Sequence, residues 1–176
     1  IGGSSAESMD DMRIVTNKGT GETAVEMAKA AYHESAEVEL WMGRCSVALP
    51  SFITTRRFES LADLEAMLPD IDHDMVAVPA ALSDFTFDRK GGKLPSEAKV
   101  TKLQLKSVPK MLPLIVKRCD KVVGFKAESG VDQKELVKEA IESLNRNYLS
   151  AVVANDLRDV KAGSTKVIFV RARYQK

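Results

Sequence analysis

The stretch Asp74-Met-Val-Ala-Val-Pro-Ala-Ala-Leu-Ser-Asp-Phe85 decides which fold we expect. It opens with small and branched apolar residues, which is typical of a strand buried on both faces of a parallel sheet. It ends in Ser83 and Asp84, and ligands of open α/β sheets bind at the carboxyl ends of the strands. Ser and Asp are also common at turns and helix caps, so this stretch predicts a sheet but does not by itself prove a site.

Strands and helices alternate on both sides of this stretch. The strands that we expect are Val38–Met42, Phe52–Phe58, Lys121–Glu128, Ala151–Asp156 and Lys166–Arg171. The helices that we expect run from Thr23 to about Ser35, from the capping Ser60 to Leu68, from Pro109 to about Arg118, and onward from the capping Asp132. This order predicts an α/β fold with a Rossmann-like, doubly wound, mostly parallel sheet, in one domain over residues 1–176.

Residues 88–108 interrupt the alternation. The segment Asp88–Ser96 is polar and contains two glycines, so we expect a mobile loop that carries Lys90 and Lys93. The segment Lys99–Val108 alternates apolar and polar residues, which indicates a half-exposed antiparallel strand. Residues 2–11 have the composition of a loop. We therefore predict a small antiparallel extension beside the main sheet.

The bulk composition narrows the function classes. The 176 residues are 44% hydrophobic and carry a net charge of +1, which argues against a general nucleic-acid surface. No apolar run is long enough to span a membrane, so we expect a cytoplasmic protein. Cys45 and Cys119 suggest no disulfide framework, and His33 and His73 lack metal-ligand spacing.

Polar residues follow three of the expected strands. They are Ser83–Phe85, the end of Gly124–Glu128, and Asn155–Asp156. If these strands are parallel, their polar ends meet at one edge of the sheet. The loop Asn17–Gly21 precedes a helix, where free amides and the helix dipole favour a phosphate. These residues predict a domain that binds a nucleotide or phosphate.

Each of these features also has a purely structural explanation. The Gly-Thr-Gly of the loop lacks the P-loop lysine and the full dinucleotide fingerprint, and it fits a helix-capping turn equally well. The loop lysines fit a solvated surface, and Phe125 fits core packing.

Five motifs in chain order add a resemblance to phosphopantothenoylcysteine synthetases. The motifs are Gly2-Gly3 with Asp10 and Arg13–Gly21, Ala80-Ala-Leu-Ser-Asp-Phe85, Lys93-Leu, Val122-Val-Gly-Phe-Lys-Ala-Glu128, and Val152-Val-Ala-Asn-Asp156. They resemble the family's Gly-Gly-Thr and Ser-Ser-Gly segments, its Ala-Ala-Val-Ala-Asp, its flap lysines, its Val-Gly-Phe-Ala-Ala-Glu and its Ala-Asn-Asp. The resemblance covers nearly the whole chain.

The resemblance implies a ligase of coenzyme A biosynthesis. In this family a nucleoside triphosphate, usually CTP with ATP as the alternative, activates 4′-phosphopantothenate as an acyl-nucleotidylate, and pyrophosphate leaves. The amine of L-cysteine then attacks the acyl carbon. Mg²⁺ accompanies the triphosphate. The resemblance also implies a homodimer built by the extension, and fusion to a flavin-dependent decarboxylase.

The resemblance assigns roles to individual residues. Asn17 and Lys93 are the expected catalytic residues, and Asn17, Asp10 and Arg13 are expected at the acid substrate. The residues expected at the nucleotide are Gly3, Gly19, Gly21, Ala80, Ala81, Leu82, Asp84, Lys93, Pro109, Lys110, Met111, Leu112, Phe125 and Asn155. Asp84 is expected to read the base, because a carboxylate accepts a hydrogen bond from the exocyclic amine of cytosine. The metal ligands are not predicted.

The chain departs from the family pattern at several positions. Gly19 and Thr20 replace two serines, and the flap keeps a single lysine of the family's run. Two lysines that precede the last Asn-Asp strand in bacterial members are missing, and Arg146 is the nearest replacement. The shorter flap favours an archaeal type of member. The reduced lysine count leaves open a non-catalytic nucleotide-binding module, and a dinucleotide-dependent reductase is the third, weaker alternative. We also expect the chain to be part of a longer protein, since Ile1–Gly3 has the character of a strand end.

Overall fold

The structure is a computed structural model that describes residues 1–89, 91–93, 95, 97, 102–161 and 163–172. The chain forms two compact units, and we describe each by itself. The first unit contains residues 1–67 and 79–111, and the second contains residues 68–78 and 112–176. No helix in the described part of the chain has the length and apolar character needed to cross a membrane.

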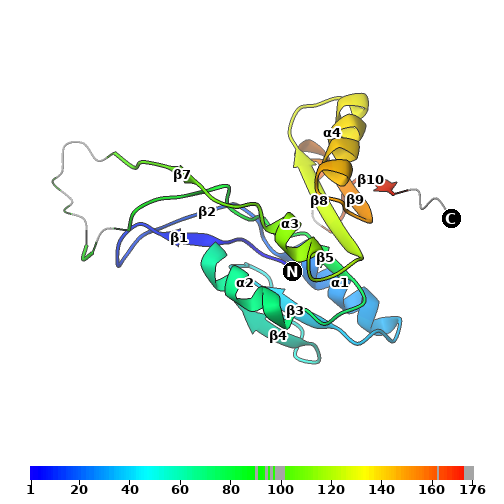
Figure 1. Cartoon of the computed structure of the whole chain (residues 1–176), viewed down its shortest axis with the longest axis horizontal. Coiled ribbons are helices and arrows are strands. Elements are labelled where there is room, and N and C mark those ends of the chain that lie inside the picture. The colour runs from blue at the N-terminus through cyan, green and yellow to red at the C-terminus, as the bar shows by residue number, and fades with distance from the viewer. Residues whose placement is uncertain (90, 94, 96, 98–101, 162, 173–176) are drawn as a thin grey trace. The chain divides into compact units, whose positions relative to one another are not determined.

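The first unit combines a helix-covered strand pair with two antiparallel ribbons (Figure 1). Its elements are β1 (Ala6–Ser8), β2 (Ile14–Thr16), α1 (Glu22–His33), β3 (Glu39–Met42), β4 (Thr54–Arg57), α2 (Leu61–Met67), β6 (Phe85–Thr86) and β7 (Lys106–Ser107). Strands β3 and β4 are parallel, whereas β1–β2 and β6–β7 are antiparallel. Helix α1 buries Ala24, Val25 and Ala28 against Leu40 and Met42 of β3, because small side chains let the helix approach the strand closely.

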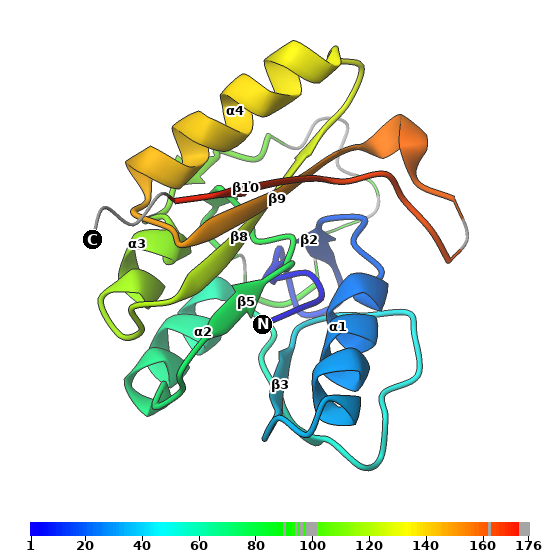
Figure 2. The same cartoon turned by 90° about the vertical axis from the view of Figure 1, so that its right-hand side faces the viewer.

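The second unit is a four-stranded sheet with the order β10-β9-β8-β5. Its elements are the 3₁₀ turn η1 (Leu68–Asp70), β5 (Val76–Val78), α3 (Met111–Val116, which begins at the unit boundary), β8 (Val122–Glu128), α4 (Gln133–Arg146), β9 (Ala151–Asp156), η2 (Leu157–Asp159) and β10 (Ile168–Arg171). Strands β5, β8 and β9 are parallel and β10 is antiparallel to β9. Helix α4 lies along this sheet (Figure 2).

Local signals in the sequence explain where α4 begins and which face it buries. Asp132 accepts a hydrogen bond from the backbone N–H of Glu135 at 2.9 Å and so caps the first turn. Leu136, Ala140 and Leu144 recur at helical spacing and are all buried. The expected capping of this helix by Asp132 is confirmed.

The mixed α/β class with a mostly parallel sheet is confirmed, and two local predictions are corrected. Residues 2–11 are not all loop, since β1 pairs with β2 there. A strand was expected over Lys99–Val108. Within its described residues, 102–108, only Lys106–Ser107 is a strand, and residues 102–105 have no regular structure. Residues 99–101 and Lys90 lie outside the described residues. A longer strand needs a partner strand of similar length, and β6 pairs through only two residues, so β7 is equally short.

Candidate functional site

Asn17 lies next to the stretch on which the fold prediction rests. It follows β2 and is exposed, and its Nδ2 donates to the backbone oxygen of Ala81 at 2.9 Å. The backbone N–H of Ala81 donates in turn to the oxygen of Gly3 at 2.8 Å. The structure therefore brings together Asn17, Gly3 and Ala80–Leu82, which are far apart in the chain. The amide of Asn17 keeps a second N–H that another acceptor can use.

The glycines of the loop after Asn17 allow close approach of neighbouring side chains. A Cβ at Gly19 would lie 2.7 Å from Oγ of Ser4 and 3.1 Å from Cβ of Ala81. Gly21 has a φ of +82° and is the N-cap residue of α1, a conformation that favours glycine. The loop therefore runs against Ser4 and Ala81 and enters the N-terminus of α1, as its predicted role as an anion site requires.

Asp84 and Lys110 form an ion pair between their exposed side chains. Their backbones are also tied together, since the N–H of Val108 donates to the oxygen of Asp84 at 3.1 Å. This bond continues the pairing of β6 with β7, in which Phe85 faces Ser107. The structure thus brings together Asp84 and the Pro109–Met111 turn, both of which were expected at the nucleotide. Met111 itself is buried at the start of α3.

Asp10 and Arg13 form the turn between β1 and β2. The carboxylate of Asp10 is 3% exposed and accepts from the backbone N–H groups of Met12 and Arg13 at 2.8 and 2.6 Å. It also accepts from the guanidinium of Arg13 at 2.7 Å. In this geometry Asp10 holds the turn, while the Arg13 side chain is 41% exposed and within reach of a ligand.

Lys93 is exposed in the loop that follows β6. The preceding residue, Gly92, accepts a hydrogen bond from the N–H of Asp11 at 3.3 Å, and Arg89 pairs with the Asp11 carboxylate at 2.7 Å. The loop is therefore attached to the β1–β2 turn, beside Asp10 and Arg13.

Three predicted nucleotide residues belong to the second unit. Phe125 lies at the middle of β8, where it pairs with Val153 of β9. Asn155 lies near the carboxyl end of β9 and pairs with Ala127 of the parallel strand β8. Both side chains are half-buried, as is Leu112 in α3. The half-burial of Phe125 is compatible with a packing role as well as with a ligand contact.

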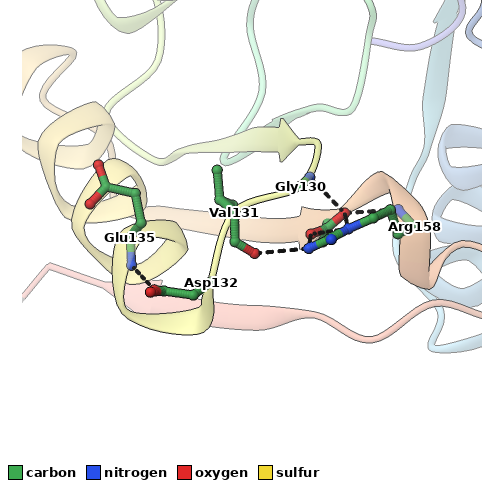
Figure 3. A network of polar contacts seen from close by, with 6 residues as sticks. Gly130, Val131, Asp132, Glu135 and Arg158 are labelled. Atoms are coloured by element: carbon green, nitrogen blue, oxygen red, sulfur yellow. Dashed lines mark hydrogen bonds and ion pairs between the residues drawn. The ribbon is translucent and has the colours of Figure 1, made fainter.

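The sequence analysis named Asp156 only as part of the Asn-Asp motif and predicted no role for it. It is 7% exposed and accepts from Nε and Nη2 of Arg158 at 3.0 and 2.6 Å, from the N–H of Arg158 at 2.8 Å and from the N–H of Gly130 at 3.4 Å. Nη2 of Arg158 also donates to the oxygen of Val131 (Figure 3). The Arg158 side chain, its backbone N–H and then Gly130 lower the pKa of Asp156 to about 2. This carboxylate closes the β8–α4 loop onto the end of β9.

Two buried serines were also missed. Ser4 and Ser5 are 1% and 0% exposed, and their hydroxyls bond to the oxygen of Gly19 and to Ser83. The only signal in the sequence is that two small hydroxyl residues follow Gly2-Gly3. Among the described residues, no group of three or more His, Cys, Asp or Glu side chains is arranged to hold a metal ion.

Residues 1–173 match the family described as the DNA/pantothenate metabolism flavoprotein C-terminal domain. The chain belongs to this family. Among its relatives, the coenzyme A biosynthesis bifunctional protein CoaBC of Methanocaldococcus jannaschii is 30% identical over 180 residues, which cover 99% of this chain and 44% of that protein. The CoaBC protein of Bacillus subtilis is 33% identical over 172 residues, covering 92% of this chain and 40% of the relative. The chain thus spans less than half the length of the curated relatives it matches.

Solved structures of the family share its fold. The DNA/pantothenate metabolism flavoprotein from Streptococcus pneumoniae has a TM-score of 0.88 at 23% identity, covering 97% of this chain and 86% of that one. A Cab2 mutant in complex with phosphopantothenate-cysteine has a TM-score of 0.75 at 16% identity, and the match covers 98% of this chain and 78% of that one. The family resemblance stated from the motifs is confirmed.

Proposed function

We propose that this chain is a phosphopantothenate–cysteine ligase of coenzyme A biosynthesis. Membership of the family and the names of the CoaBC relatives support this activity. The observation that supports specific residue roles is the hydrogen bond from Asn17 to the backbone oxygen of Ala81. Ala81 lies two residues before Ser83 and three residues before Asp84. This contact between the residue proposed for the acid substrate and the segment proposed for the nucleotide supports the proposal.

In the first proposed step, a carboxylate oxygen of 4′-phosphopantothenate attacks the α-phosphorus of the triphosphate, and the bond to the β-phosphate oxygen breaks. Pyrophosphate leaves with the bonding electrons. Asn17 binds the carboxylate through the N–H that Ala81 does not use. In the second step the cysteine amine attacks the acyl carbon, and the bond from that carbon to the phosphate oxygen breaks. The nucleoside monophosphate leaves with the bonding electrons, and the nitrogen loses a proton to solvent. The same N–H donates to the acyl oxygen as charge develops there.

The nucleotide is proposed to lie along the Gly19–Gly21 loop and Asp84. Asp84 accepts from the exocyclic amine of cytosine, which favours CTP over UTP. Lys93 is an exposed cation that attracts the phosphates. Lys110, which pairs with Asp84, is proposed to contact the nucleotide beside that carboxylate. For Phe125 and Asn155, a contact with the nucleotide stays a prediction from the family resemblance. Mg²⁺ fits this scheme as the ion of the magnesium–triphosphate substrate, because Mg²⁺ often keeps several waters and binds mainly through substrate phosphates.

The proposed assembly follows the family. We propose a homodimer, a cytoplasmic location, and fusion to a flavin-dependent decarboxylase. The relatives are named bifunctional proteins, which supports a fusion. These proposals concern the whole protein, and the experiments below address the ligase first.

Pyrophosphate release tests the activity. The assay contains phosphopantothenate, L-cysteine, Mg²⁺ and each triphosphate in turn, and we expect release that depends on phosphopantothenate and is fastest with CTP. Binding of nucleotide without release would favour the non-catalytic module instead. A fluorescence titration with NADPH separates the reductase alternative, for which we expect no binding.

Replacing Asn17 by Asp tests the catalytic role. We expect turnover to fall at least a hundredfold, because a carboxylate repels both the Ala81 oxygen and the substrate carboxylate. Asn147 provides the matched control, since its Nδ2 also donates to a backbone oxygen, that of Ser143, at 2.9 Å. Asn147→Asp should keep activity. Full activity in Asn17→Asp, with the fold checked by circular dichroism, would reject the assigned role.

A further inference from the structure

Ser5 connects three segments of the first unit. Its backbone N–H donates to the oxygen of Ala81 at 3.3 Å, and its backbone oxygen accepts from Oγ1 of Thr16 at 2.7 Å. Its side-chain oxygen accepts from the N–H of Ser83 at 2.9 Å and lies 3.1 Å from the Ser83 hydroxyl. Ser5 itself is 0% exposed, whereas Ala81 and Ser83 are half-buried and Thr16 is exposed.

The partners of Ser5 immediately precede the two residues on which the proposed chemistry depends. Thr16 precedes Asn17, and Ser83 precedes Asp84. Asn17 and Ser5 also share one acceptor, because the Ala81 oxygen receives both the Asn17 amide and the Ser5 N–H. The hydrogen bonds of the buried residue Ser5 therefore hold both the backbone next to the Asn17 amide and the backbone next to the Asp84 carboxylate.

We propose that Ser5 is a positioning residue that sets the Asp84 carboxylate relative to the Asn17 amide. This inference rests on the proposed function. The backbone of Ser5 anchors the Asn17 side through Thr16 and Ala81, and its hydroxyl anchors the Asp84 side through Ser83. The two anchors are chemically separate, so one substitution removes the hydroxyl contact while the backbone contacts stay.

Because the two anchors are separate, substitutions at Ser5 and at Thr16 should change different kinetic parameters. Ser5→Ala removes the acceptor of the Ser83 N–H and frees the segment that carries Asp84. It should raise the KM for CTP about tenfold and lower the preference for CTP over UTP by a similar factor, with the KM for phosphopantothenate unchanged. Thr16→Val removes the other anchor without a change of shape. It should lower kcat or raise the KM for phosphopantothenate several-fold and leave the base preference unchanged.

Ser4→Ala is the matched control. Ser4 is 1% exposed, and its hydroxyl donates to the oxygen of Gly19 at 3.2 Å, on the loop rather than on the Asp84 segment. A purely structural effect of losing a buried hydroxyl would appear in thermal unfolding of both serine variants and would not change the ratio of CTP to UTP. A changed ratio in Ser5→Ala alone supports the positioning role.

The experiment measures kcat and KM for CTP, UTP and phosphopantothenate, with calorimetric titration of each triphosphate. An unchanged CTP preference in Ser5→Ala, or an equal loss in Ser4→Ala, overturns the inference. So does a wild-type enzyme that accepts CTP and UTP equally. If Ser5→Ala fails to fold, Ser5→Cys, which keeps the shape with a weaker acceptor, is read by the same criteria. Wild-type protein that neither binds a triphosphate nor releases pyrophosphate refutes the proposed function itself, whereas the other outcomes refute only the role of Ser5.

Discussion

Single side chains in the first unit divide into exposed groups that a ligand can reach and buried groups that hold them. Asn17, Asp84 and Lys110 are exposed, while Ser5 and Asp10 are buried and bonded to backbone amides. Exposed ion pairs contribute little to stability, so substitutions at Asp84 or Lys110 should act on ligand binding more than on folding. Substitutions of the buried, hydrogen-bonded groups should change both ligand binding and folding stability.

Lys110→Ala should weaken triphosphate binding about tenfold and change the free energy of unfolding by less than about 1 kcal/mol. Lys106→Ala is the control, because Lys106 pairs with Asp88 at 2.6 Å across the same ribbon and has no proposed role. Calorimetric titration of CTP and urea unfolding of both variants make the comparison. Equal binding by the two variants would exclude Lys110 from the nucleotide site.

The buried carboxylate of Asp156 predicts a pH dependence of stability. Its pKa is lowered from 3.8 to about 2, so its stabilising effect is fully present above about pH 4 and is lost as the pH falls toward 2. Asp156→Asn should be less stable than wild type at pH 6, and the gap between their melting temperatures should narrow between pH 4 and pH 2. A constant gap for Asp156→Asn would contradict the prediction.

At the scale of elements, helices α2 and α4 begin where a side chain accepts a hydrogen bond from an amide of the first turn. At α2, the Ser60 hydroxyl accepts from the N–H of Asp63 at 3.1 Å, and the Asp63 carboxylate accepts from the N–H of Ser60 at 2.8 Å. This is a reciprocal capping box. The backbone N–H of Ser60 is the main reason that the pKa of Asp63 is lowered. Helix α4 uses the simpler single cap at Asp132.

Asp132→Ala should therefore reduce the free energy of unfolding by about 1 kcal/mol, because the N–H of Glu135 loses its acceptor (Figure 3). Asp132→Asn should cost clearly less, since asparagine caps helices about as well as aspartate. Denaturant unfolding at neutral pH measures both. Equal losses in the two variants would show that charge, rather than the hydrogen bond, stabilises this helix end.

At the scale of the whole molecule, the prediction concerns self-association. Two large apolar side chains are exposed on and beside the β6–β7 ribbon, Phe85 by 51% and Leu105 by 54%. We expect a homodimer in which this apolar surface is covered, since exposed apolar patches commonly mark interaction sites. Leu105→Glu should raise the dimer dissociation constant by tenfold or more in equilibrium sedimentation. Lys102→Glu, at an exposed charged position nearby, is the control. A monomeric wild type at high concentration would refute the dimer.

The sequence predicted the local elements well because their signals are local. Helical spacing and the cap at Asp132 predicted α4, and the β-branched run predicted β9. The sequence did not predict the extension correctly, because the alternation over Lys99–Val108 carries no information on how much partner strand is present. It did not predict β1 either, since the pairing of Ala6–Ser8 depends on β2.

The sequence by itself determined the class of fold, the order of most elements and, through five spaced motifs, the family. The tertiary structure alone decided that Ser5 bonds to Ser83, 78 residues away, and that Lys110 pairs with Asp84. It alone also decided that Asp156 is buried against Arg158. The physical reason is that propensity and periodicity act over a few residues, whereas burial and hydrogen-bond partners depend on segments that only folding brings into contact.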